Sequence, residues 1–72
     1  MTPQETARVQ RYLRDTFGNE TIALKQRSQT DDSVEVLLGG EFIGVVYKDD
    51  EDGEVSYAFN MAILEMDLPP SG

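Results

Sequence analysis

The fold is decided by the hairpin sequence VEVLLGGEFIGVVY, residues 34–47. Apolar side chains alternate along both halves, a period of two that is typical of β-strands with one buried face. Gly39 and Gly40 supply the positive φ that both central positions of a type I′ turn need. We therefore predict strands over residues 34–38 and 41–48, joined by a tight turn.

The two-residue turn also predicts the register of the hairpin. Counting outward from the turn gives the pairs Leu38–Glu41, Leu37–Phe42, Val36–Ile43 and Val34–Val45. One face would then carry Val34, Val36, Ile43, Val45 and Tyr47. Leu37, Phe42 and Val46 would share the opposite face, where they form either an interaction surface or an ordinary scatter of exposed apolar residues.

The chain before the hairpin predicts an amphipathic helix. Thr2 is a good N-cap, Pro3 suits the first helical position, and Glu5 completes a capping box. Gly18 readily takes the left-handed conformation that ends helices, so we expect the last helical residue to be Phe17.

The helix has one apolar face and one basic face. The apolar face carries Val9, Leu13 and Thr16, with Tyr12 and Phe17 beside it. Arg8, Arg11 and Arg14 are expected on the more exposed sides. They could contact phosphates, but the net charge of the chain is −8, so an exposed helix face is the preferred interpretation.

Two further strands are predicted around the hairpin. Residues 21–25 alternate in polarity and form the first strand, followed by a polar turn over residues 28–33. Val55, Tyr57 and Phe59 alternate in the fourth strand and can return to the same face as the hairpin's apolar set.

Beyond Asn60 apolar and polar residues still alternate, but the apolar positions move by one residue. Either a β-bulge near residues 60–62 restores the facing, or the end of this strand serves another surface. A short helix over residues 61–66 is the competing interpretation. Residues 1–68 are predicted to form a single α+β domain, with an N-terminal helix packed on one face of a four-stranded antiparallel meander. Residues 69–72 are expected to be a disordered tail.

Composition narrows the classes of function. A chain of 72 residues without Cys or His lies near the lower size limit for a self-sufficient core and has no disulfide or Cys/His metal site. The net charge argues against nucleic acid and anionic membranes as partners. There is no signal-like start and no apolar run long enough to span a membrane, so we expect a cytoplasmic protein.

The sharpest local feature is the acidic stretch from Asp49 to Glu54, which holds five of the fourteen acidic residues. Aligning Gly53 with the invariant glycine of a calcium-binding EF-hand puts Lys48 and Phe59 at ligand positions, so that motif fails. Asp31 and Asp32 are expected at the same end of the sheet. A solvated turn is the preferred interpretation; a docking site for a basic partner and a loose cation site formed by Asp49, Asp50 and Asp52 are alternatives.

No catalytic constellation emerges from the sequence. Ser28, Ser33 and Ser56 have no His to activate them, and carboxylate pairs are too common here to be informative. We expect neither an enzyme nor a bound cofactor.

Several runs together resemble a family of short alphaproteobacterial proteins of unknown function. The likeness covers most of residues 5–68 and includes the runs Tyr12-Leu13-Arg14, Phe17-Gly18-Asn19, Asp32-Ser33-Val34-Glu35-Val36, Glu41-Phe42-Ile43-Gly44-Val45, Asp50-Glu51-Asp52-Gly53-Glu54-Val55-Ser56-Tyr57 and Met61-Ala62-Ile63-Leu64. The family has no activity to transfer, so the resemblance implies no catalytic or binding residue.

The sequence favours a small non-catalytic module that binds another protein or a second copy of itself as a homodimer. The candidate interaction surface comprises Leu37, Phe42, Val46, Leu64, Met66, Asp49, Asp50, Glu51 and Asp52. The alternative is a protein that binds a small ligand or a divalent cation at the acidic end of the sheet.

Overall fold

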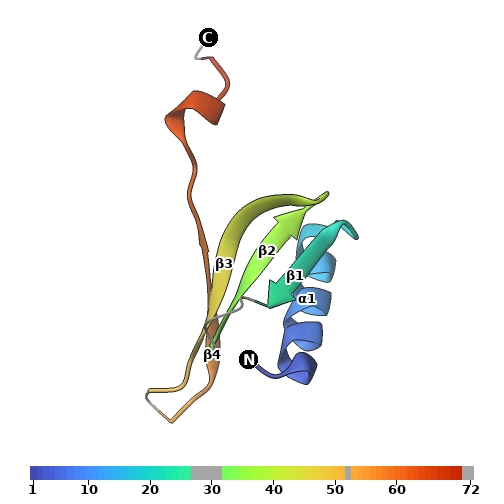
Figure 1. Ribbon diagram of the computed structural model, residues 1–72, viewed down its shortest axis with the longest axis vertical. Coiled ribbons are helices and arrows are strands. Elements are labelled where there is room, and N and C mark those ends of the chain that lie inside the picture. The colour runs from blue at the N-terminus through green and yellow to red at the C-terminus, as the bar shows by residue number, and fades with distance from the viewer. Residues whose placement is uncertain (27–31, 52, 71–72) are drawn as a thin grey trace.

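The protein is an α+β domain in which one helix covers part of one face of an antiparallel sheet (Figure 1). A computed structural model describes residues 1–26, 32–51 and 53–70. The sheet order β1-β2-β3-β4 follows the chain, and each neighbouring pair is antiparallel. The elements are α1 (Pro3–Phe17), β1 (Ile22–Gln26), β2 (Ser33–Leu38), β3 (Glu41–Asp49), β4 (Ser56–Met61) and the 3₁₀ turn η1 (Glu65–Asp67).

Both ends of α1 form as the sequence predicts. The Glu5 amide donates to Thr2 Oγ1 at 3.1 Å, and the Thr2 amide donates to Glu5 Oε1 at 2.9 Å, completing the capping box. Pro3 occupies the first turn. Gly18 adopts the left-handed conformation with φ of 59°, so the helix ends at Phe17.

The hairpin turn is confirmed, but the predicted register holds only next to it. Gly39 and Gly40 have φ of 58° and 87°, and Leu37 pairs with Phe42. One residue further the register shifts, so that Val36 pairs with Gly44 instead of Ile43. Ile43 is therefore the extra residue of a β-bulge, which counting from the turn did not foresee.

This bulge reverses the facing of the rest of β3. Val34 pairs with Val46, and both are buried beneath α1 at 0% and 1% exposure. The prediction that Val46 lies on the face away from the helix is wrong, and so is the prediction that Val45 and Tyr47 lie on the helix side. The single inserted residue exchanges the two faces of the strand because side chains alternate with a period of two.

Gly44 fits the bulge because β3 lies very close to β4 there. A Cβ atom at this position would lie 2.7 Å from Phe59 Cε1 and would also collide with the backbone oxygen of Asn60. A residue with a side chain would force the two strands apart, so glycine permits this close approach.

The core is small and lies between α1 and the middle of the sheet. Ser33, predicted to belong to a turn, instead begins β2 and is buried at 1% exposure. Residues 28–31 of that predicted turn lie outside the described residues. The buried apolar residues are Leu13, Ile22, Val34, Val36 and Val46, with Met1, Val9, Leu24, Ile43 and Phe59 packed against them.

Polar side chains of α1 attach the helix to the edge strand β1. The Leu24 amide donates to Gln10 Oε1 at 2.9 Å, and Arg14 Nε donates to the Ile22 carbonyl at 2.7 Å. Arg14 is half-buried by this contact, whereas the sequence predicted it to be exposed. Anchoring at β1 leaves the helix off-centre and the β4 side of the sheet less covered.

The C-terminal arm, residues 62–70, follows β4 and leaves the sheet (Figure 1). All residues from Ala62 to Pro70 are exposed. The predicted bulge and the predicted helix over residues 61–66 are both wrong: β4 ends at Met61 in unbroken register with β3, and the helical part is a single 3₁₀ turn at Glu65–Asp67. The predicted tail residues 71–72 lie outside the described residues.

Candidate functional site

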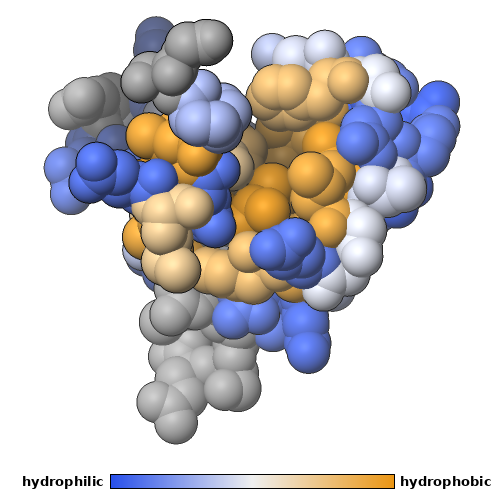
Figure 2. All heavy atoms as spheres, turned by 90° about the horizontal axis from the view of Figure 1, so that it is seen from above, coloured by the Kyte–Doolittle hydropathy of each residue, from blue (hydrophilic) through white to orange (hydrophobic). Residues whose placement is uncertain are grey.

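An apolar groove of about 610 Å³ runs between α1 and the β3–β4 side of the sheet. Seen from above, apolar side chains gather around a hollow that hydrophilic residues surround (Figure 2). The groove is lined by Glu5, Arg8, Val9, Tyr12, Leu13, Thr16, Phe17, Val46, Tyr57 and Phe59. Its volume falls within the range typical of ligand-binding pockets.

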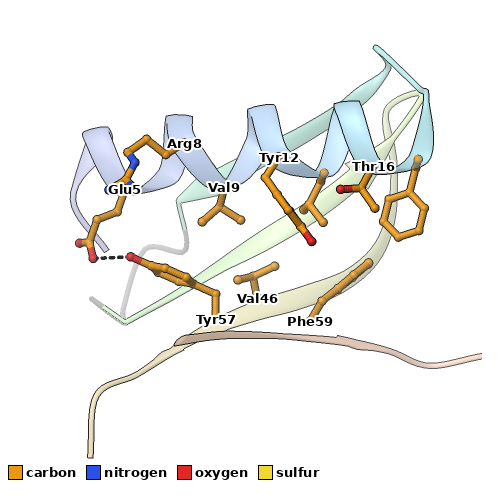
Figure 3. Close-up of a pocket in the computed structure, with 10 residues that line it drawn as sticks. Glu5, Arg8, Val9, Tyr12, Thr16, Val46, Tyr57 and Phe59 are labelled. Atoms are coloured by element: carbon orange, nitrogen blue, oxygen red, sulfur yellow. Dashed lines mark hydrogen bonds between the residues drawn. The ribbon is translucent and has the colours of Figure 1, made fainter. Parts of the chain in front are cut away.

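The floor of the groove consists of apolar side chains from three elements. Val46 of β3 pairs with Phe59 of β4, so both point to the helix side of the sheet. Val9 extends from α1 toward Val46 in the close-up view (Figure 3). This arrangement confirms that Tyr57 and Phe59 return to the helix side. On β3, Phe59 pairs with Val46 and Tyr57 pairs with Lys48, so these two residues take the places on that face that were predicted for Val45 and Tyr47.

Two aromatic side chains of α1 border the groove and remain largely exposed. Tyr12 is 67% exposed and Phe17 is 58% exposed. Large rings are normally among the side chains that contribute most to burial. Rings left in water beside a hollow with an apolar floor extend the apolar surface that a ligand could cover.

A polar cluster links α1 to the sheet at the Glu5 end of the groove. Glu5 Oε2 lies 2.6 Å from Lys48 Nζ of β3. The same oxygen accepts a hydrogen bond from the Tyr57 hydroxyl of β4 at 2.9 Å (Figure 3). The side chains of Glu5 and Lys48 are only 17% and 27% exposed. One carboxylate therefore holds the first turn of the helix to two strands.

These contacts fix the protonation states within the cluster. Hydrogen bonds from Lys48, the Thr2 amide and Tyr57 lower the pKa of Glu5 to about 2. The Glu5 carboxylate in turn raises the pKa of Lys48 and the pKa of Tyr57. All three pKa values move away from neutrality, so the cluster serves as a structural tether and is poorly suited to proton transfer near pH 7.

The helix side of the groove carries positive charge. Arg8 lines the groove. Arg11, one turn further along α1, is 71% exposed and forms a 3.5 Å salt bridge with Asp15. An exposed pair of this kind contributes little to stability, so Arg11 can exchange that partner for another carboxylate at low cost.

The structure separates the residues of the predicted interaction surface. Leu37 and Phe42 pair directly, as predicted, and Phe42 is 55% exposed on the face away from α1. Val46 does not join them, because the bulge places it in the core and on the groove floor. Leu64 and Met66 lie in the C-terminal arm at 54% and 85% exposure.

The acidic turn joins β3 to β4 at the opposite end of the molecule from the arm (Figure 1). The Glu51 amide donates to Asp49 Oδ1 at 3.1 Å, and the Gly53 amide donates to the Asp50 carbonyl at 3.4 Å. Asp31 and Asp52 lie outside the described residues. Within residues 1–26, 32–51 and 53–70, no three acidic side chains gather closely enough to hold a metal ion.

The groove is not evident from the sequence. Tyr12 and Phe17 were predicted only to flank the buried face of the helix, and Tyr57 and Phe59 only to face it. The one signal in the sequence is the number of aromatic residues. The fifteen-residue helix and the four-stranded sheet carry more aromatic rings than the surface between them needs. Where these additional rings gather follows only from the anchoring of the helix over β1, which the sequence does not show.

The fold and groove define a small α+β domain with an open apolar cleft between helix and sheet. The chain belongs to DUF3126, a family of proteins of unknown function, whose family model matches residues 5–67. Family membership is thus confirmed, while the alphaproteobacterial source stays a prediction. Searches of curated proteins and of solved structures found no match. Among the described residues, no helix has both the length and the apolar character needed to cross a bilayer.

Proposed function

We propose that this protein is a non-catalytic cytoplasmic interaction module whose groove binds an apolar segment of a protein chain. The observation that carries the proposal is the groove itself, whose apolar floor is bordered by the largely exposed rings of Tyr12 and Phe17. Covering such a surface would bury apolar area at a gain of about 25 cal/mol per Å². A chain of marginal size gains most from a partner that completes its core.

The groove also indicates the chemistry of its ligand. Val46, Phe59 and Val9 offer apolar contacts, whereas Arg8 offers positive charge on the helix side. The Glu5 carboxylate at one end is already neutralised by Lys48. A segment of apolar residues interspersed with acidic residues matches this surface, because its carboxylates can reach arginine while its apolar side chains fill the floor.

A divalent-cation site at the acidic turn has weaker support. The Asp49 side chain already accepts a hydrogen bond from the Glu51 amide, whereas Asp50 accepts one from the Gly53 amide through its backbone carbonyl. The described acidic side chains do not converge as calcium ligands must. The groove, with an apolar floor and arginine on its helix side, is the better supported site.

A peptide titration tests the proposed site. Acetyl-Leu-Glu-Leu-Glu-Leu-amide is added to methyl-labelled protein carrying Leu64→Ser and Met66→Ser, which weaken any competition from the protein's own arm. We expect saturable shifts of the Val9, Leu13 and Val46 methyl signals, with smaller effects from acetyl-Leu-Lys-Leu-Lys-Leu-amide. Groove methyl signals that stay unchanged at millimolar peptide, or shifts centred on the methyl groups of Leu37 beside Phe42, would refute the proposed site.

A further inference from the structure

We propose that the occupant of the groove is the C-terminal arm of a second copy of this chain, so that two copies exchange arms in a symmetric dimer. The inference rests on the proposed function, because it names the partner of the same groove. Four features of the arm support it: exposed apolar side chains, negative charge, sufficient length, and a direction that leads away from its own groove.

The arm carries apolar side chains at high exposure. Ile63 is 69% exposed, Met66 is 85% exposed, and Leu64 and Leu68 are each 54% exposed. Such a concentration of apolar residues within one short segment, outside any core, is typical of a segment that packs on another surface. The groove is an uncovered apolar surface of the same molecule.

Charge makes the arm and the groove complementary. Glu65 and Asp67 alternate with the arm's apolar residues, and no basic residue follows Lys48 in the sequence. Arg8 lines the groove, and Arg11 is exposed on the same helix. The acidic arm therefore meets the basic side of the groove, which favours this pairing over contact with another acidic surface.

The arm is long enough to fill the groove. Residues 62–68 span about 19 Å with the 3₁₀ turn η1 in place, and about 23 Å when fully extended. The part of α1 that borders the groove, from Glu5 to Phe17, rises about 18 Å along the helix axis. An arm of this length can cover the whole helix side of the groove.

The direction of the arm favours a second copy over the molecule's own groove. To enter its own groove the chain would have to reverse immediately after Met61. Residues 61–64 are Met-Ala-Ile-Leu, without the Gly, Pro, Asn or Asp that tight turns favour. Leu64 is extended, with φ of −82° and ψ of 138°, and the arm leads away from α1 (Figure 1).

Exchange of arms gives a closed assembly. Each copy donates one arm and offers one groove, so a two-fold axis satisfies both contacts without leaving a further arm free. In each copy the arm follows β4 directly, and β4 also lines the groove. The two exchanged contacts therefore form one surface that is continuous with the β4 strands.

Sedimentation of full-length variants tests the exchange. The groove variant Tyr12→Lys and the arm variant Leu64→Lys change exposed residues, so melting curves should confirm that both fold. Phe42→Lys is the matched control, since Phe42 is similarly exposed on the opposite face. We expect a dimer for the parent chain and for Phe42→Lys. Each of the other two variants should raise the dimer Kd by more than roughly tenfold, as expected when apolar contacts are replaced by charge.

Mixing the two weakened variants gives a test specific to exchange. The Tyr12→Lys copy retains a normal arm and the Leu64→Lys copy retains a normal groove, so the mixture should form a heterodimer with one intact contact. It should associate more strongly than either variant alone. A parent chain that stays monomeric at high concentration, a dimer disrupted by Phe42→Lys, or a mixture no stronger than its components would overturn the inference. The proposed function is tested separately by the peptide titration, and it fails if the leucine–glutamate peptide does not bind the groove.

Discussion

Lys48 Nζ lies 2.6 Å from Glu5 Oε2, so a salt bridge joins the first turn of α1 to β3. The same carboxylate oxygen accepts a hydrogen bond from Tyr57 of β4. Glu5 also completes the capping box with Thr2. One side chain thus couples the start of the helix to the two strands that form the floor of the groove, and its charge makes that coupling dependent on pH.

Replacing Glu5 with Gln should lower stability at neutral pH and flatten the acid limb of the stability profile. The folded pKa of Glu5 is about 2, below its ordinary value of 4.5. Its carboxylate therefore contributes stability above pH 4.5 that is lost as the pH falls toward 2. Melting temperatures measured from pH 7 to pH 2 should show the gap between parent and variant closing over that window.

Glu20→Gln is the control for this effect, because Glu20 is 75% exposed and lies 3.9 Å from Arg14. A weak exposed pair should contribute little. A Glu5→Gln variant that follows the parent at every pH would show that the cluster does not tether the helix.

Val46→Ala should destabilise the fold, whereas Val45→Ala should have a smaller effect. Val46 is 1% exposed in the core, and Val45 lies on the opposite face because of the bulge at Ile43. Removing the buried methyl groups of Val46 should cost about 2 kcal/mol. Chemical denaturation of both variants measures this difference. A larger loss of stability for Val45→Ala than for Val46→Ala would indicate the unbulged register and contradict the structure.

Gly44→Ala should destabilise through contact with β4. The added Cβ would lie 2.7 Å from Phe59 Cε1 and still closer to the Asn60 backbone. We expect a loss of about 1–3 kcal/mol, typical of overpacking, with amide shifts spreading through residues 58–61. A variant as stable as the parent would show that β3 and β4 are not so close at the bulge.

Gly39→Ala should destabilise for a different reason, since open space surrounds its Cβ position. Its φ of 58° would cost an alanine about 1–2 kcal/mol. Gly39→Asn should recover part of this loss, because Asn tolerates the left-handed region better. Denaturation midpoints that rank Asn below Ala would argue against the type I′ turn.

The sequence predicted the features whose causes are local. Thr2 and Glu5 cap the helix, Gly18 ends it, and Gly39-Gly40 sets the hairpin, because each acts on neighbouring backbone. The bulge at Ile43 lies beside Gly44, where β3 closely approaches the distant Phe59 and Asn60 of β4. The helix is held in position by hydrogen bonds from Gln10 and Arg14 to β1. Such long-range contacts leave no periodic signal, so the groove that they create could not be located beforehand.

The most direct test of the central claim is an isotope-filtered NOE experiment on an equal mixture of labelled and unlabelled full-length chains. We predict contacts between the Met66 methyl group of one copy and the Val9 and Val46 methyl groups of the other. Contacts confined to Leu37 and Phe42, or Met66 contacts present only within one chain, would contradict the exchange of arms.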